Sequence, residues 1–187
     1  MTETYTELIN KYFEELKGLI KKKKLKEDFI YGENEIELTY LNQVIKIDIL
    51  SMKFNKDIND KEKVIILRYL CKFPYKKSDE LITFKSLPEG NFYFPSIYSR
   101  IYLPLIKKYG KEPEKFVGKS IEIGAERFND FSVKFNIFSD VFFIFDLIPE
   151  DDEFPADLRI LFNKTTSEIF EIEDIAIIGE IIVSKIT

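Results

Sequence analysis

The stretch from residue 131 to residue 187 constrains the fold of this chain more than any other part of the sequence. Apolar and polar residues alternate along 132–137 and again along 157–162, which is typical of strands with one buried face. The run 141–145 between them is apolar at every position and indicates a central strand. A mostly apolar helix then opens at Glu173. The pattern predicts a three-stranded antiparallel meander with a final helix packed on it.

Two helices and a hairpin are predicted in the first part of the chain. Apolar residues at helical spacing indicate an amphipathic helix over 5–20. Alternation over 36–40 and 45–50 indicates a β-hairpin that turns at Asn42-Gln43. Asn59-Asp60 then caps a second helix. With the meander, these elements predict an α+β fold in which an antiparallel sheet packs against helices and the N-terminal hairpin extends or flanks the C-terminal strands.

The middle of the chain has weaker signals. A short strand is predicted over 81–84, and a helix over 98–109 that Gly110 ends. A short helical turn follows over 114–120, whereas the pattern of 121–128 is ambiguous. A chain of 187 residues can bury about 70% of its unfolded surface in one core. We therefore predict a single α+β domain over 1–187, with residues 1–26 as an optional N-terminal helical appendage.

Several reaction types are excluded by residue types that the sequence lacks. There is no histidine, which removes the usual proton shuttle at neutral pH, imidazole metal ligands and the Ser-His and Cys-His nucleophile pairs. Cys71 is the only cysteine, so an intramolecular disulfide and a cysteine-held cluster cannot form within one chain. Cys71 lies in an apolar run, which favours an inert packing thiol. This cysteine usage favours a cytoplasmic location.

Charge and hydropathy limit the partners that we expect. The net charge is −5 and no segment is long and apolar enough to span a membrane, so neither nucleic acid nor a membrane is an expected partner. Lysines at 21–24 and Lys26 follow the first helix, where cations offset the helix dipole. Contact with an anionic partner is the alternative interpretation of these lysines.

Carboxylates form the main candidate site. Asp151, Asp152 and Glu153 share one acidic turn, where a solvated loop, a partner or cation contact, and a catalytic group are all open interpretations. The order of a calcium-binding loop is absent, so no metal site is predicted. Glu180 lies mid-helix among isoleucines, and is either exposed, paired with an arginine such as Arg159 or Arg127, or a functional acid.

An aromatic and basic cluster is the second candidate. Residues 92–95 with Tyr98, Arg100 and Tyr102 place several rings near a turn. Such rings can stack on a base or a flat cofactor, although ordinary core packing is the preferred interpretation.

Short motifs from about residue 60 onward resemble a family catalogued as a domain of unknown function in anaerobic bacteria and archaea. The matching residues are Leu67, Tyr69 and Leu70; Phe84, Leu87 and Pro88; Asp152, Glu153, Phe154 and Pro155; Ile160, Leu161 and Phe162; and Glu173, Asp174, Ala176, Gly179 and Glu180. The resemblance implies an association with a four-cysteine iron–sulfur domain, in settings of corrinoid or one-carbon metabolism. It implies no catalytic residues, and it leaves the cofactor unknown.

The chain departs from this family pattern at three places. It lacks the cluster cysteines, it has Arg68 where the family has a histidine, and 147–149 replace an aromatic-Gly segment. The first departure removes a cluster-binding role for this chain alone. The sequence thus predicts a non-catalytic intracellular binding or accessory module whose partner is an iron–sulfur or corrinoid protein. The alternative is a metal-assisted hydrolase that works through Asp151, Asp152 and Glu153.

Overall fold

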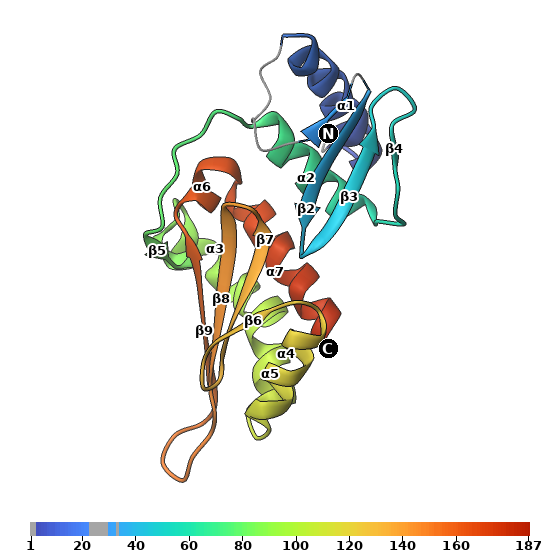
Figure 1. Ribbon diagram of the computed structural model, residues 1–187. Coiled ribbons are helices and arrows are strands. Elements are labelled where there is room, and N and C mark those ends of the chain that lie inside the picture. The colour runs from blue at the N-terminus through green and yellow to red at the C-terminus, as the bar shows by residue number, and fades with distance from the viewer. Residues whose placement is uncertain (1–2, 23–29, 33) are drawn as a thin grey trace. The chain divides into compact units, whose positions relative to one another are not determined.

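A computed structural model describes residues 3–22, 30–32 and 34–187 of the chain (Figure 1). The chain divides into two compact units, residues 1–76 and 77–187, and each is described by itself. Both units combine helices with antiparallel strands, so the predicted α+β class is confirmed. The single domain over 1–187, with its appendage over 1–26, stays a prediction.

In the N-terminal unit, two helices accompany a small antiparallel sheet. The described elements are α1 (Tyr5–Lys21), β1 (Ile30–Tyr31), β2 (Glu35–Tyr40), β3 (Gln43–Asp48), β4 (Lys53–Phe54) and α2 (Asp60–Cys71). The strands pair in the order β1-β2-β3-β4. Thr4 and Glu7 form a capping box at the start of α1, and Asn59 accepts a hydrogen bond from the Glu62 backbone N–H at the start of α2. Both predicted helices are therefore confirmed.

The N-terminal hairpin turns one residue earlier than predicted. Leu41 and Asn42 both have left-handed backbones, with φ of 46° and 58°, as a two-residue hairpin turn requires. Gln43 is already in β3, where it pairs with Tyr40. This register is preferred because it also pairs Leu38 with Ile45, which keeps the apolar side chains on one buried face.

The C-terminal unit contains a second sheet with its own helices. Its elements are β5 (Leu81–Ile82), η1 (Phe84–Ser86), α3 (Gly90–Ile97), η2 (Tyr98–Tyr102), α4 (Leu103–Tyr109), α5 (Pro113–Glu122), β6 (Glu126–Asn129), β7 (Ser132–Phe138), β8 (Val141–Ile148), β9 (Asp157–Asn163), α6 (Thr165–Ile169) and α7 (Ile172–Ile186). The strand order is β5-β9-β8-β7-β6, and every pairing is antiparallel. The predicted meander is β7, β8 and β9. The hairpin of the N-terminal unit does not extend it, because that hairpin belongs to the other sheet.

The central helix begins earlier than the sequence indicated. A helix was predicted from residue 98, but α3 already begins at Gly90 and continues through a π-helical turn, η2, into α4. Pro104 lies in the first turn of α4, where proline is tolerated, whereas Pro95 lies inside α3. The prediction missed the first part of this helical segment because residues 92–95 were expected near a turn.

Aromatic side chains form much of the core of the C-terminal unit. Phe162 lies at the centre, with its ring centroid 5.2 Å from that of Phe84 and 5.2 Å from that of Phe143. All three side chains are fully buried. Helix α7 approaches η2 closely, because a Cβ at Gly179 would lie 2.7 Å from Ile101 Cδ1. These contacts join the sheet and the helices into one packed unit.

Candidate functional site

The acidic turn predicted from the sequence is the loop that joins β8 to β9. Asp151, Asp152 and Glu153 are all exposed there. The carboxylate of Asp151 accepts hydrogen bonds from the backbone N–H groups of Glu153, at 2.8 Å, and Phe154, at 2.7 Å. Asp151 thus serves the turn itself, since its Oδ1 atom satisfies two backbone donors that would otherwise need water.

The base of this loop is anchored to the end of α4. The backbone N–H of Glu150 donates to the Gly110 carbonyl at 3.1 Å, and Lys111 Nζ lies 3.2 Å from a carboxylate oxygen of Glu150. A Cβ at Gly110 would lie 2.6 Å from the Cβ of Ala156, so the loop and the helix end are in tight contact. The loop is therefore held in one arrangement by backbone and packing contacts.

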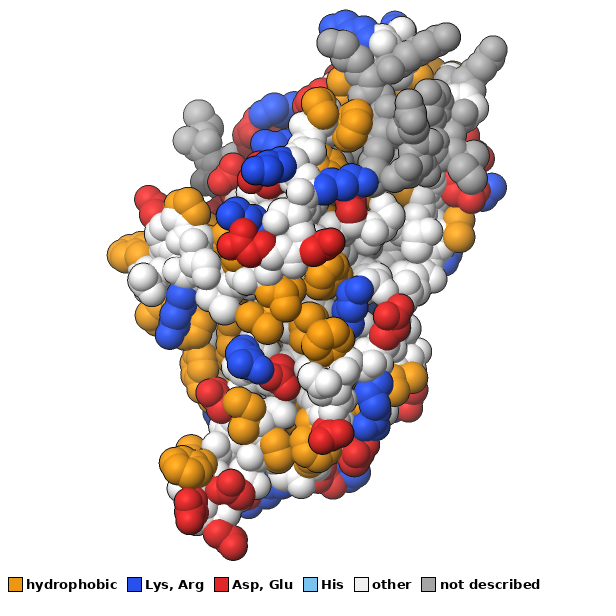
Figure 2. All heavy atoms as spheres, turned by 60° about the vertical axis from the view of Figure 1, so that its left-hand side comes forward, with side chains coloured by type: hydrophobic (Ala, Val, Ile, Leu, Met, Phe, Trp, Pro, Cys, Tyr) orange, Lys and Arg blue, Asp and Glu red, His pale blue; other side chains and the backbone are white. Residues whose placement is uncertain are grey.

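Large apolar side chains are exposed beside the acidic groups of the loop. Phe154 is 66% exposed, and Ile148, the last residue of β8, is 46% exposed. Figure 2 shows acidic side chains gathered at the lower end of the view, where this loop lies, with apolar groups nearby. Phe154 is thus an exposed aromatic ring beside exposed carboxylates.

Glu180 belongs to a different place in the unit. Its carboxylate pairs with the guanidinium of Arg100 on η2, and its side chain is 21% exposed. The two arginines suggested from the sequence have other partners, since Arg159 pairs with Asp146 and Arg127 with Glu114. Figure 1 shows α7 away from the loop between β8 and β9. The structure thus brings three of the four candidate acids together and leaves Glu180 with a structural ion pair.

A metal centre is not formed by these acids in the described part of the chain. Within residues 3–22, 30–32 and 34–187, no three Asp, Glu or Cys side chains come together in a group that could hold a metal ion. The absence of a metal site and the metal-assisted hydrolase both stay predictions.

The sequence suggested that the aromatic cluster lies near a turn. In the structure, the cluster lies in a helix. Tyr98 stacks on Tyr102 with ring centroids 5.5 Å apart, and the ring centroids of Phe94 and Tyr102 are 5.4 Å apart. Burial, and secondarily the carboxylate of Asp157, raise the pKa of Tyr102 well above its usual value. These rings pack against one another, which supports the core interpretation, although Phe92 on the same helix is 80% exposed.

A buried polar network in the N-terminal unit escaped the sequence analysis. Glu62 is 6% exposed and accepts hydrogen bonds from the Asn59 amide at 2.6 Å and the Tyr40 hydroxyl at 3.5 Å. Burial, and secondarily the Glu62 carboxylate, raise the pKa of Tyr40 well above its usual value. The network joins the end of β2 to the first turn of α2 and satisfies its own polar groups, so it serves the fold.

Cys71 is buried at the end of α2, as an inert packing thiol should be. Its Sγ atom lies 3.6 Å from the Tyr12 carbonyl oxygen. Burial, and secondarily the carboxylate of Glu15, raise the pKa of the thiol from 9.0 to about 12. The neutral thiol is therefore the form present at neutral pH.

We expect this thiol to react slowly in the folded protein. A pKa of about 12 in place of 9.0 lowers the thiolate fraction at pH 8 by about a thousandfold, and only the thiolate attacks a disulfide reagent. At pH 8, Cys71 should react with dithionitrobenzoate at least about a hundredfold faster in concentrated urea, where the chain is unfolded, than in the folded protein. If the rate in the folded protein is within about tenfold of the rate in the unfolded protein, Cys71 is accessible and reactive.

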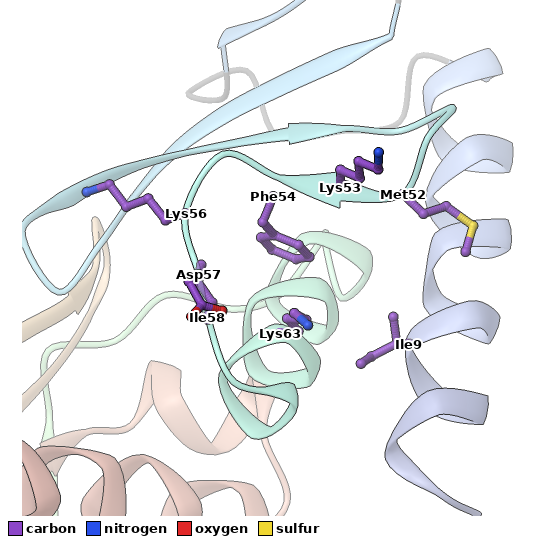
Figure 3. A pocket seen from close by; sticks show the side chains of 8 residues that line it. All are labelled: Ile9, Met52, Lys53, Phe54, Lys56, Asp57, Ile58 and Lys63. Atoms are coloured by element: carbon purple, nitrogen blue, oxygen red, sulfur yellow. The ribbon is translucent and has the colours of Figure 1, made fainter.

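The N-terminal unit also contains a cleft that was not predicted from the sequence. It has a volume of about 240 Å³ and is lined from α1, from β4 and the residues around it, and from α2 (Figure 3). Its lining residues are Ile9, Met52, Lys53, Phe54, Lys56, Asp57, Ile58 and Lys63. Seven of these eight residues lie between positions 52 and 63, and α1 contributes Ile9. The predicted role of the lysines at 21–26 is not tested, because residues 23–29 lie outside the described residues.

None of the helices in the described ranges has the length and apolarity that crossing a bilayer requires.

The family described as a domain of unknown function (DUF3786) matches residues 25–185. No curated protein and no solved structure matches the chain. The family match begins well before the motifs near residue 60, so it includes the N-terminal hairpin as well as the whole meander. The chain therefore belongs to the DUF3786 family, whose function is unknown.

Proposed function

We propose that this protein is a non-catalytic binding or accessory module that contacts a partner protein through the loop between β8 and β9. The observation that carries the proposal is the exposure of Phe154, at 66%, on a loop that the rest of the unit holds in place. Leaving a large ring in water costs free energy that burial at an interface would recover. A pre-ordered loop also loses little conformational entropy when it binds.

The charges around Phe154 indicate the chemistry of the partner surface. Asp152 and Glu153 directly precede Phe154 and are exposed, so a partner with an apolar pocket and a basic rim would complement the loop. We propose that this partner is a protein of iron–sulfur or corrinoid metabolism, as the family resemblance implies, and that both act in the cytoplasm of an anaerobe. The lack of cluster cysteines in this chain supports a role beside such a protein.

Replacing Phe154 by alanine should abolish the capture of the partner. Removal of an interface anchor typically costs about 2 kcal/mol or more, which is roughly a thirtyfold rise in Kd. Immobilised protein is incubated with an anaerobic lysate and with a purified four-cysteine iron–sulfur domain, and retained proteins are identified by mass spectrometry. Phe128, which is 51% exposed on β6, offers the matched control Phe128→Ala.

The outcome is decided by the comparison of these two variants. Retention by the unmodified chain and by Phe128→Ala, but not by Phe154→Ala, would support the proposal. Equal retention by all three would show that the β8–β9 loop is not the contact surface.

Removal of charge by Asp152→Asn with Glu153→Gln should slow association and weaken its dependence on salt, because exposed charges act mainly on the association rate.

A further inference from the structure

The loop between β8 and β9 is too small to form a protein interface by itself. A stable interface takes roughly 800 Å² of surface from each partner, which corresponds to about 20–30 residues. The loop comprises only residues 149–156. A partner that covers Phe154 must therefore also contact a neighbouring surface of the C-terminal unit.

The first neighbouring surface is the face of the sheet next to the loop. Asp146 and Ile148 lie two positions apart on β8, so their side chains are on the same face. The register places Arg159 of β9 opposite Asp146. The residues between them in β8, Phe145 and Leu147, are buried in the core on the other face. Ile148 and Arg159 therefore belong to the face that is turned away from this core.

The second neighbouring surface is the corner between α4 and α5, which holds the base of the loop through Gly110 and Lys111. Its exposed side chains are charged. The side chain of Lys111 is 80% exposed, and Lys115 and Glu112 form an exposed ion pair. All residues from 103 to 120 are described, and none of the large apolar side chains among them is exposed.

The composition of the two surfaces decides between them. The core of an interface is apolar and enriched in arginine, whereas lysine and glutamate are depleted there. The sheet face offers Ile148, which is 46% exposed, and Arg159, whose side chain is 62% exposed. The helix corner offers lysines and glutamates. The sheet face is therefore the surface that a partner covers at the lower cost in free energy.

The ion pair on the sheet face is compatible with burial. Arg159 donates to Oδ2 of Asp146 through Nε, at 3.1 Å, and also through Nη2. The pair carries no net charge, so a partner that covers it buries no uncompensated ion. The guanidinium has further N–H groups that a carbonyl or carboxylate of the partner can accept from.

We propose that the partner of the β8–β9 loop also covers this face of the sheet, with Ile148 in an apolar contact and Arg159 as a hydrogen-bond donor. This extended contact rests on the proposed function, since it begins at the same loop. The partner that fits is a protein with an apolar patch and an acceptor group beside the pocket for Phe154.

Ile148→Ser and Ile121→Ser form a matched pair of variants. Both isoleucines are 46% exposed, and Ile121 lies at the end of α5 that is farther along the chain from Lys111. A purified four-cysteine iron–sulfur domain is the probe, and its Kd for the full-length protein is measured by calorimetry. Ile148→Ser should raise this Kd about tenfold, because apolar surface that the contact buries is lost. Ile121→Ser should leave the Kd unchanged.

Isoleucine methyl signals give an independent measurement. In the methyl-labelled full-length protein, the probe should shift the signal of Ile148 and leave that of Ile121 in place. The same spectrum shows whether each variant is folded. Lys111→Met tests the helix corner, and it should change the Kd by less than about twofold, because exposed ion pairs contribute little.

The possible results separate this extended contact from the proposed function. If Phe154→Ala weakens binding and Ile148→Ser does not, the loop contact stands and the sheet face takes no part. Equal effects of the two isoleucine substitutions would show that the loss is not specific to the sheet face. A larger effect of Lys111→Met than of Ile148→Ser would place the contact at the helix corner.

Two further results would also overturn the extended contact. If the unmodified chain does not bind the probe, both the proposed function and its extension to the sheet face are wrong. Self-association of the chain that Ile148→Ser abolishes, measured by sedimentation, would identify a second copy of the chain as the occupant of this face.

Discussion

Replacing Phe162 by alanine is expected to lower the free energy of unfolding of the C-terminal unit by about 3–5 kcal/mol. Phe162 is fully buried on β9, and its ring contacts those of Phe84 and Phe143, each with centroids 5.2 Å apart. Removal of the ring forfeits its transfer free energy and leaves a cavity between elements that cannot collapse onto one another. Such a loss is a large fraction of the stability of a typical domain.

Native-state hydrogen exchange is the appropriate measurement, because it reports each unit of the full-length chain separately. The opening free energies of amides in β8 and β9 should fall together in Phe162→Ala. The exposed residue Phe128 again gives the control, and Phe128→Ala should change these values by about 0.5 kcal/mol or less. Equal effects of the two substitutions would show that the aromatic cluster does not hold the C-terminal sheet.

Replacing Gly90 by alanine should destabilise the same unit by about 3 kcal/mol or more. A Cβ at this position would lie 2.1 Å from the carbonyl oxygen of Phe84 and 3.1 Å from the Cα atom of Lys85. Both of these atoms belong to the backbone, so no side-chain rotation relieves the clash. Either η1 or the start of α3 must move, and Phe84 would then lose its position in the core.

Gly118 gives the opposite expectation and is therefore an informative control. It lies inside α5, and a Cβ there would meet nothing within 4 Å. Gly118→Ala should stabilise the unit by about 0.5–1 kcal/mol, because alanine loses less backbone entropy than glycine on forming a helix. Thermal unfolding followed by circular dichroism, with both variants side by side, distinguishes the two predictions. A stable Gly90→Ala variant would mean that η1 does not approach the helix as closely as the structure shows.

Periodicity along the chain explains why the meander could be predicted. The apolar alternation of β7 and β9, and the continuous apolar run of β8, follow from which side of the strand each residue faces. That information is local, so it is readable without knowledge of the partner strands. The same holds for α1 and α2, whose capping residues Thr4 and Asn59 lie next to the helices that they begin.

Errors arose where a local signal competed with packing. The turn of the first hairpin was misplaced by one residue, since the choice between Asn42-Gln43 and Leu41-Asn42 depends on which register buries the apolar side chains. The start of α3 was missed because residues 92–95 were expected near a turn. In the structure, α3 packs against η1 and η2, and no local pattern shows these contacts.

The candidate acids show the same division. Asp151, Asp152 and Glu153 are neighbours in sequence, so their proximity was certain, although the use of Asp151 to close its own turn was not foreseen. The partner of Glu180 could not be inferred, because Arg100 lies 80 residues away in the chain. The cleft in the N-terminal unit was not predicted either, because only the fold brings Ile9 of α1 and Lys63 of α2 next to residues 52–58.

The sequence by itself determined the α+β class, the meander, the capped helices and the exclusion of histidine and multi-cysteine chemistry. These depend on residue type and on periods of two or 3.6 residues, which are properties of a single segment. Only the tertiary structure decided that the hairpin and the meander belong to separate sheets, that Arg100 pairs with Glu180, and that Ile9 of α1 shares a cleft with residues 52–58. These features depend on contacts between distant segments, and the packing that selects such contacts leaves no pattern within any one of them.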